Sequence, residues 1–192
     1  GGDTRITTDN TSEAMGVWIR KGAGVLFMAD RGGPPHLYRK DLTTGAEETV
    51  LPPGRLQQPT SVSPDGTTLA YAQRTSSGTY DILTLPIDGP GATPTVLLGT
   101  PFDEVQLRFS PDGRAAAYLS NESGRYELYV ATYPGMSSRQ RVSDGGARAP
   151  EWDPVRNELL YFAGDGRLIA VPVRTTPEPR LGRAETLFTV NE

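Results

Sequence analysis

Short apolar segments alternate with turn residues along the whole chain, and one copy of the pattern is especially clear. Residues 104–109 and 114–120 flank the sequence Ser110-Pro111-Asp112-Gly113. Pro presets φ, Asp can bond its own backbone and Gly accepts a positive φ, so a tight turn between two strands is predicted. Large side chains then alternate along residues 126–133 with the period of two that is typical of a strand. Residues 139–143 are predicted to form a fourth strand.

The same order of strands and turns returns four times along the chain. Each copy has an aromatic or β-branched residue before its first turn, namely Trp18, Val62, Phe109 and Trp152, at spacings of 44, 47 and 43 residues. Several short strands in each period of about 45 residues are typical of a β-propeller blade. A β-sandwich also has frequent turns, but it does not require the same turn chemistry to return at this interval. The other copies predict strands at residues 25–29, 36–40, 47–51, 59–62, 68–73, 80–85, 95–98, 149–152, 158–163, 167–173 and 185–189.

We therefore predict an all-β fold, a β-propeller of four four-stranded antiparallel blades that forms part of a larger ring. The predicted segments are an orphan outer strand in residues 1–10 and blades at residues 11–53, 54–99, 100–144 and 145–192. The orphan strand is inferred because Arg5-Ile6-Thr7-Thr8 resembles Arg141-Val142-Ser143, the last predicted strand before Trp152. An open arc would expose apolar blade faces, so we expect further blades, a second copy or ring closure to cover them.

Composition fits this fold and excludes several classes of function. The 192 residues include 22 Gly and 17 Pro, which is too many breakers for long helices. The net charge is −4 and no dense cluster of Lys and Arg occurs, so we expect no nucleic-acid partner. A chain without cysteine cannot form a disulfide, a thiolate zinc site or a cysteine nucleophile. No apolar run is long enough to predict a membrane span in this segment.

The sequence offers no catalytic constellation, and we predict no catalytic, cofactor or metal site. His36 is the only histidine and no Gly-x-Ser-x-Gly turn occurs, so neither a hydrolase triad nor a metal-dependent lyase fits. We interpret His36 as a surface residue of a turn. The adjacent carboxylates Glu47-Glu48 and Asp103-Glu104 would point to opposite faces of a strand, and we interpret them as solvated charges. Turn chemistry rather than metal binding accounts for the Asp-Gly pairs that begin at Asp65, Asp112, Asp144 and Asp165.

One set of polar residues remains as a candidate binding site. Glu13, Gln57, Glu104 and Arg148 come at or just before the first predicted strand of each copy. We expect this position to lie at the mouth of the propeller channel, where polar groups could orient a small ligand or a peptide. The alternative is a channel filled with water.

Several motifs resemble known propeller repeats. Ser63-Pro64-Asp65-Gly66 with Leu69-Ala70-Tyr71, and Ser110-Pro111-Asp112-Gly113 with Ala117-Tyr118, are similar to TolB-like, Trp-Asp-type repeats of bacteria. This resemblance covers nearly the whole chain. A narrower one, to the C-terminal propellers of bacterial receptor-like serine/threonine protein kinases, rests mainly on residues 110–190. The residues that carry it are Ser120 to Val130, Tyr133-Pro134-Gly135, Ser143-Asp144-Gly145-Gly146, Trp152, Asp165 to Val173 and Glu185-Thr186-Leu187-Phe188.

The resemblance implies a non-catalytic binding or sensory module in the extracytoplasmic part, periplasm or cell surface, of a modular bacterial protein. In the receptor-like kinases the kinase domain lies upstream, followed by a membrane helix, and this chain contains none of the kinase motifs. The alternatives are a TolB-like periplasmic protein-interaction propeller and the gating propeller of a serine peptidase. We expect a protein or small-ligand partner and no cofactor, and the exposed end blades offer a route to self-association.

Overall fold

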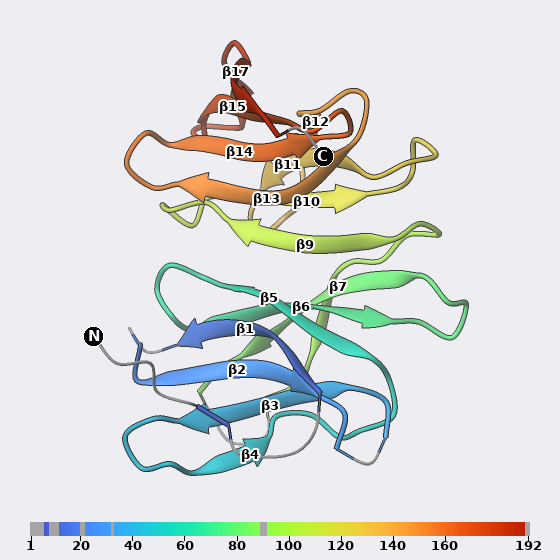
Figure 1. Ribbon diagram of the computed structural model, residues 1–192, viewed down its shortest axis with the longest axis vertical. Coiled ribbons are helices and arrows are strands. Elements are labelled where there is room, and N and C mark those ends of the chain that lie inside the picture. Colours follow the sequence, from blue (N-terminus) through green and yellow to red (C-terminus); the bar gives the residue numbers. More distant parts are fainter. Residues whose placement is uncertain (1–5, 8–11, 20–21, 32, 89–91, 191–192) are drawn as a thin grey trace. The chain divides into compact units, whose positions relative to one another are not determined.

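The computed structural model describes residues 6–7, 12–19, 22–31, 33–88 and 92–190 of the chain. Within these ranges the regular elements are strands joined by turns, and they form four antiparallel sheets (Figure 1). This confirms the predicted all-β fold with its propeller blades. In each sheet, strands that follow one another in the sequence also pair side by side, as expected of a blade, except that the last strand of the fourth sheet pairs with the strand two before it. Among the described residues we find no helix with the length and apolar character that crossing a membrane requires.

The strands of each blade follow in sequence order. The first sheet contains β1 (Glu13–Ile19), β2 (Gly24–Ala29), β3 (His36–Asp41) and β4 (Glu47–Thr49). The second contains β5 (Gln57–Val62), β6 (Thr68–Arg74), β7 (Tyr80–Pro86) and β8 (Thr95–Leu98). The third contains β9 (Glu104–Phe109), β10 (Ala115–Ser120), β11 (Glu127–Thr132) and β12 (Gln140–Arg141). The fourth contains β13 (Ala147–Asp153), β14 (Glu158–Ala163), β15 (Arg167–Arg174), β16 (Arg180–Leu181) and β17 (Glu185–Thr189).

The fourth sheet differs from the prediction in its outer strand. Residues 185–189 do form a strand, but β17 pairs only with the first half of β15, from Arg167 to Ala170. The second half of β15 pairs with β16, which the sequence analysis missed, at Val173 and Arg174. Two short segments therefore share the position that one strand occupies in the other sheets.

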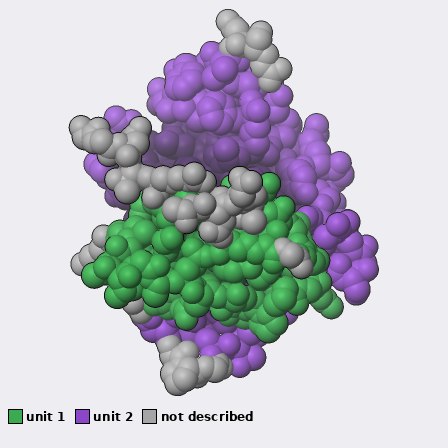
Figure 2. All heavy atoms as spheres, turned by 60° about the horizontal axis from the view of Figure 1, so that its bottom comes forward, with its two compact units in different colours: residues 1–59 green, residues 60–192 purple. Residues whose placement is uncertain are grey.

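The chain divides into two compact units, residues 1–59 and residues 60–192 (Figure 2). In the first unit, the buried side chains of Val25, Phe27, Ala29 and Tyr38 form a small apolar cluster. Ile6 packs against this cluster. The rest of the predicted orphan strand in residues 1–10, apart from Thr7, lies outside the described residues, so that strand stays a prediction.

In the second unit, the alternation of side chains decides which neighbouring sheet each one meets. All six residues of β10 are buried. Ala115, Ala117 and Leu119 join a cluster with residues of the fourth sheet, while Ala116 and Tyr118 join a cluster with residues of β6 and β7. Because successive side chains of a strand point to opposite faces, the third sheet is packed on both sides by its neighbours.

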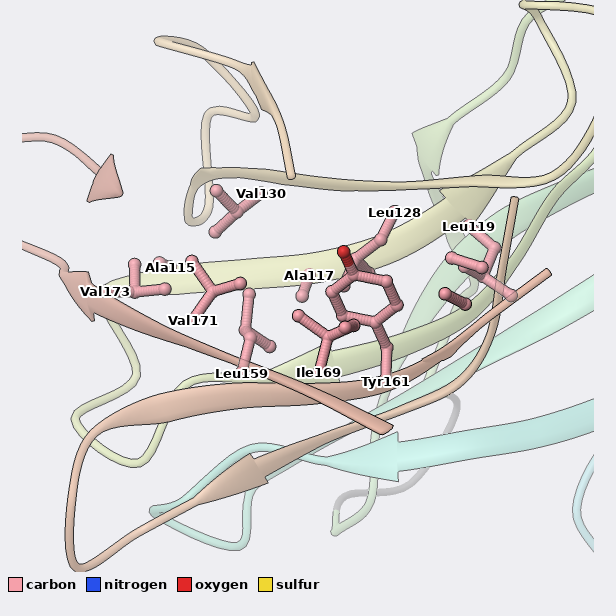
Figure 3. Packing of buried hydrophobic residues seen from close by; sticks show 12 residues of the cluster. Ala115, Ala117, Leu119, Leu128, Val130, Leu159, Tyr161, Ile169, Val171 and Val173 are labelled. Carbon is pink, nitrogen blue, oxygen red and sulfur yellow. The ribbon is translucent and has the colours of Figure 1, made fainter. Parts of the chain in front are cut away.

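The contact between the third and fourth sheets forms the larger of these clusters. Side chains of β10 and β11 face those of β14 and β15 across an apolar layer (Figure 3). The residues in the middle of this layer are Leu128, Val130, Leu159, Tyr161, Ile169, Val171 and Val173. The two sheets are therefore held by the apolar faces that the alternating pattern provides.

The first strands of three sheets share one irregularity. Met15 in β1, Gln106 in β9 and Ala149 in β13 have φ values of 57°, 52° and 50°. The pairing register of each strand shifts at this point. A bulge of this kind bends the strand and changes the direction of the residues before it. The bulge therefore sets where the loop ends of these blades place their side chains.

Candidate functional site

Three of the four predicted channel-mouth residues occupy equivalent places in their sheets. Glu13, Gln57 and Glu104 are the first residues of β1, β5 and β9. The equivalent residue of the fourth sheet is Ala147, because it begins β13, and the prediction that Arg148 holds this place is wrong. The predicted strand began at Ala149, two residues late. A shift of one residue moves a side chain to the opposite face of a strand, so Arg148 has different surroundings.

The equivalent residues make their hydrogen bonds within their own units. Gln57 is 4% exposed, and its Oε1 accepts a hydrogen bond from the Leu37 N–H at 3.3 Å. Glu13 forms an ion pair with Arg31 at 2.9 Å. Glu104 is 2% exposed and accepts a hydrogen bond of 2.5 Å from the Thr100 hydroxyl. The interpretation of Glu104 as a solvated charge is therefore wrong, because the turn before β9 brings a hydroxyl donor to its buried carboxylate.

The surroundings of Glu104 favour its neutral form. Burial raises the pKa of this carboxyl above its ordinary value. The hydrogen bonds from Thr100 act in the opposite direction, and the charge of Asp81 adds to the rise. Ser120 contributes a long contact of 3.4 Å from its hydroxyl. Glu104 thus has hydroxyl and backbone donors but no cation among its strongest influences.

A second buried carboxylate, Glu127, was not singled out from the sequence. It begins β11, its side chain is fully buried, and the N–H groups of Gly145 and Gly146 each donate to its Oε1 at 3.0 Å. The Ser143 hydroxyl also donates to it, and the Nε atom of Arg125 lies 3.1 Å away. The sequence motifs Ser120 to Val130 and Ser143-Asp144-Gly145-Gly146 contain Glu127 and its donors, but they indicated only a family resemblance and a turn at Asp144.

The pKa of Glu127 shifts in the opposite direction to that of Glu104. Burial by itself would raise the pKa of Glu127, but the Ser143 hydroxyl and the two glycine N–H groups outweigh it and lower the pKa. Gly145 and Gly146 have φ values of 109° and 100°, a backbone conformation that other residues rarely adopt. Glu127 therefore ties the loop between the third and fourth sheets to β11.

His36 also lies elsewhere than expected. It begins β3, where it pairs with Ala29, and it is only 2% exposed. Its ring packs against that of Tyr38 with the centroids 4.7 Å apart, and its Nδ1 lies 3.1 Å from the Pro34 carbonyl oxygen. The interpretation as a surface residue of a turn is wrong, because strand pairing and the tyrosine ring enclose the imidazole.

The aspartates of the Asp-Gly turns act as backbone acceptors. Asp65, Asp112 and Asp165 each accept a hydrogen bond from the N–H group two residues later, at 3.0, 3.1 and 3.3 Å. Asp144 instead forms an ion pair with Arg141. In the described parts of the chain, no three His, Cys, Asp or Glu residues are grouped so that they could hold a metal ion.

An open hollow of about 770 Å³ lies between loops of the third and fourth sheets. Its polar residues are Arg125, Tyr126, Arg148, Asp165 and Thr189. The other lining residues are Ala147, Val190 and the glycines at positions 145, 146, 164 and 166. We call this feature the Arg148 hollow. It brings Arg148, the residue shifted from the predicted channel-mouth position, together with groups that the sequence analysis did not connect with it.

Close loop packing fixes the glycine wall of the Arg148 hollow. A Cβ atom on Gly164 would lie 2.4 Å from the Gly145 carbonyl oxygen. One on Gly166, where φ is 83°, would lie 2.9 Å from the Val190 carbonyl oxygen. The loops can approach this closely only without side chains. The glycines are therefore explained by packing, and the hollow has a rigid wall.

Comparison with solved structures agrees with the fold. TolB from Acinetobacter baumannii matches with a TM-score of 0.72 and 16% sequence identity, over 97% of this chain and 46% of that one. A putative TolB from Agrobacterium tumefaciens matches with a TM-score of 0.66 and 22% identity, over 88% of this chain and 62% of that one. A puromycin-hydrolyzing peptidase of Mycobacterium tuberculosis has a TM-score of 0.64 and 19% identity, over 90% of this chain and 30% of that one.

These structural matches, all below 25% identity, show a shared fold, and the chain spans less than two thirds of each of these proteins. The sequence itself matches the family model described as the TolB beta propeller domain, over residues 1–161. This match includes the first three sheets and reaches into the fourth. The chain therefore belongs to the TolB beta propeller domain family.

Proposed function

We propose that this chain is a non-catalytic protein-interaction propeller that works outside the cytoplasm of a bacterium. The observation that carries the proposal is the family match over residues 1–161. Propellers present loops from several blades at one end, which suits them to bind a partner. Fold alone does not define a function, so the proposal also depends on how the polar residues are used.

The residues with acid–base potential support binding rather than chemistry. Glu104, Glu127 and His36 are each no more than 2% exposed, and partners within the chain surround them. A general acid or base has to come within hydrogen-bonding distance of its substrate. These side chains instead anchor turns and strand ends, and thereby hold the blade loops in place.

Chemical cross-linking in intact cells tests this function. Cells that produce the parent protein are treated with a cross-linking reagent that cannot pass the cytoplasmic membrane. Adducts of the propeller are then identified by mass spectrometry. We expect adducts that join the propeller to one or a few other proteins. Protection of the propeller from the reagent until the cells are lysed would contradict the extracytoplasmic location, and accessibility without any adduct would contradict the interaction.

The more specific proposal is that the parent is a receptor-like serine/threonine kinase. It is supported by the motif resemblance over residues 110–190. The parent gene is then expected to encode His-Arg-Asp and Asp-Phe-Gly motifs and a membrane helix upstream of the propeller. The purified parent protein is expected to transfer phosphate from ATP to its own Ser or Thr residues. A signal peptide and a small α/β domain in that place would overturn the kinase proposal and favour a TolB-like protein.

Peptidase propellers provide the second candidate. The chain is similar in fold to part of the puromycin-hydrolyzing peptidase and to part of prolyl oligopeptidase B from Galerina marginata, the latter with a TM-score of 0.68 and 9% identity. A gating propeller would require a hydrolase domain in the same parent protein. A downstream Gly-x-Ser-x-Gly turn would favour this candidate, and a parent without one would exclude it.

A further inference from the structure

The arginines around the Arg148 hollow differ in their partners. Arg125 and Arg141 both contact the Glu127 carboxylate, and Arg141 also pairs with Asp144. The Nε atom of Arg167 lies 2.8 Å from the carboxylate of Asp165. Arg148 lies beside these paired groups, and no carboxylate partner for it occurs among the described residues. The exposed Arg148 guanidinium is therefore available to a ligand.

The guanidinium of Arg148 is held in position by an aromatic ring. Arg148 and Phe162 are cross-strand partners in the pairing of β13 with β14. The Cζ atom of Arg148 lies 5.4 Å from the centroid of the Phe162 ring, within the range of a cation–π interaction. A stacked guanidinium keeps its N–H groups available and loses little further freedom on binding. Its planar pair of donors matches the two oxygens of a carboxylate.

The neighbouring segment of the lining supplies a second cation and a restrained aromatic side chain. Arg125 is 62% exposed at its side chain, although its Nε atom contacts Glu127. The Tyr126 hydroxyl donates to the Asp103 carboxylate at 2.8 Å, which restrains a ring that remains 38% exposed. A ligand in the hollow would thus meet two arginines and a tyrosine, together with Asp165, which is paired with Arg167.

The size of the hollow and its arginines favour one kind of ligand. A volume of about 770 Å³ is larger than a single small anion needs and lies within the range of ligand sites. A nucleic acid is disfavoured because the whole chain has a net charge of −4. A short peptide segment with acidic side chains fits both the volume and the local positive charge.

We propose that the Arg148 hollow binds a carboxylate group of an acidic peptide segment, with Arg148 as its main anchor. This inference rests on the proposed function, because the segment would belong to the partner protein. The Arg148 guanidinium would donate two hydrogen bonds to the carboxylate, while Arg125 adds further electrostatic attraction.

Calorimetric titration with a defined peptide tests the proposal. The probe is tetraglutamate with blocked ends, added to the 192-residue protein at low ionic strength, and tetraglutamine is the uncharged comparison. Tetraglutamate is expected to bind and tetraglutamine to show no binding. Arg148→Gln is expected to weaken tetraglutamate binding about tenfold, as loss of a charged hydrogen-bond partner predicts. The affinity of Arg148→Lys for tetraglutamate is expected to lie between those of the wild type and Arg148→Gln, because lysine keeps the charge but lacks the planar pair of donors.

Arg156→Gln is the matched control. Arg156 is an exposed arginine in the turn after β13, at the opposite end of that strand from Arg148. Equal weakening by Arg148→Gln and Arg156→Gln would overturn the proposal in favour of general charge attraction. Melting temperatures of both variants establish that they fold, and an unfolded Arg148→Gln would leave Arg148→Lys as the test.

Two further results would also overturn the proposal. If inorganic phosphate binds as tightly as tetraglutamate and depends equally on Arg148, the hollow is a general anion site. If tetraglutamate fails to bind while the propeller still forms partner adducts in cells, the carboxylate site is wrong and the interaction function stands. If tetraglutamate does not bind and the propeller also forms no partner adducts in cells, both the carboxylate site and the interaction function are rejected.

Discussion

Two buried carboxylates of the third sheet show how neighbouring donors decide charge at a single residue. Glu127 accepts hydrogen bonds from Ser143 and two glycine N–H groups and has arginines nearby, so its pKa lies below the ordinary value. Glu104 has hydroxyl donors and the charge of Asp81 nearby, and burial raises its pKa. The same residue type therefore supports the fold as an anion in one place and resists ionisation in the other.

Replacing Glu127 with Gln is expected to destabilise the fold. The change removes the charge that Arg141 and the loop donors stabilise, and we expect a loss of about 3 kcal/mol at pH 7. Because the folded pKa is lowered, the contribution of Glu127 is fully present above the unfolded value near 4.5 and is lost as the pH falls through the folded pKa. Urea unfolding from pH 7 to pH 3 measures this. Equal stability of both proteins at pH 7 would contradict the account.

Replacing Glu104 with Gln is expected to have the opposite outcome. Because the folded pKa is raised, wild-type stability decreases as the pH rises from the unfolded value near 4.5 through the folded pKa. Gln resembles the neutral acid, and position 57 already has Gln in the equivalent place. We expect urea unfolding at pH 7 to show no loss or a gain of about 1 kcal/mol. A loss as large as that for Glu127→Gln would refute this assignment of charge.

At the scale of elements, local turn chemistry predicted most strands. The strands at residues 95–98, 104–109, 158–163 and 185–189 have the bounds that the sequence predicted, because Pro, Asp and Gly mark the turns beside them. The start of β13 was placed two residues late because its bulge contains Ala149 rather than glycine. β16 was missed because two paired residues leave no alternating pattern. The start of β13 and the presence of β16 both depend on contacts between strands, which the local sequence does not encode.

The candidate site was predicted less well than the strands, for the same physical reason. His36 follows two prolines and so resembled a turn residue, but strand pairing and Tyr38 bury it. Glu127 has no local signal of its own, since its donors come from a loop sixteen or more residues later. Arg148 was noticed, yet its partner Phe162 and the hollow depend on the packed loops.

The bulge of β13 leads to a prediction for Ala149. Its φ of 50° lies in the left-handed region, which costs a residue with a Cβ atom about 1 kcal/mol and costs glycine much less. Ala149→Gly is therefore expected to raise the free energy of unfolding by up to about 1 kcal/mol, offset in part by unfolded-state entropy. Ala147→Gly in the same strand, without a positive φ, is the control and is expected to destabilise. If thermal unfolding shows that Ala149→Gly and Ala147→Gly lower the free energy of unfolding equally, the bulge geometry is contradicted.

At the scale of the whole molecule, equivalent tryptophans have unequal surroundings. The Trp152 Nε1 atom donates to the Arg108 carbonyl oxygen of the third sheet at 3.1 Å. Trp18 occupies the same register in the first sheet, opposite Val25 as Trp152 is opposite Leu159, yet it is 58% exposed. A neighbouring blade thus provides a hydrogen-bond acceptor for Trp152. Because Trp18 is exposed, we expect this blade face to take part in association.

Self-association through Trp18 can be measured by sedimentation velocity. We expect the chain to associate as its concentration rises, and Trp18→Ser to weaken the association at least about tenfold, since burial of a large apolar side chain contributes about 2 kcal/mol. Val155→Ser is the control, because Val155 is 90% exposed in a turn. A protein that stays monomeric throughout, or equal effects of the two variants, would count against the association.

Site-specific photo-cross-linking tests the central claim, that the loops of the third and fourth sheets bind a partner protein. A photoreactive amino acid is placed at position 148 or at position 156 of the parent protein in living bacteria. We predict that illumination joins position 148 to one partner protein and that position 156 gives little or none of this product. Equal products from both positions, or none from either, would contradict the account.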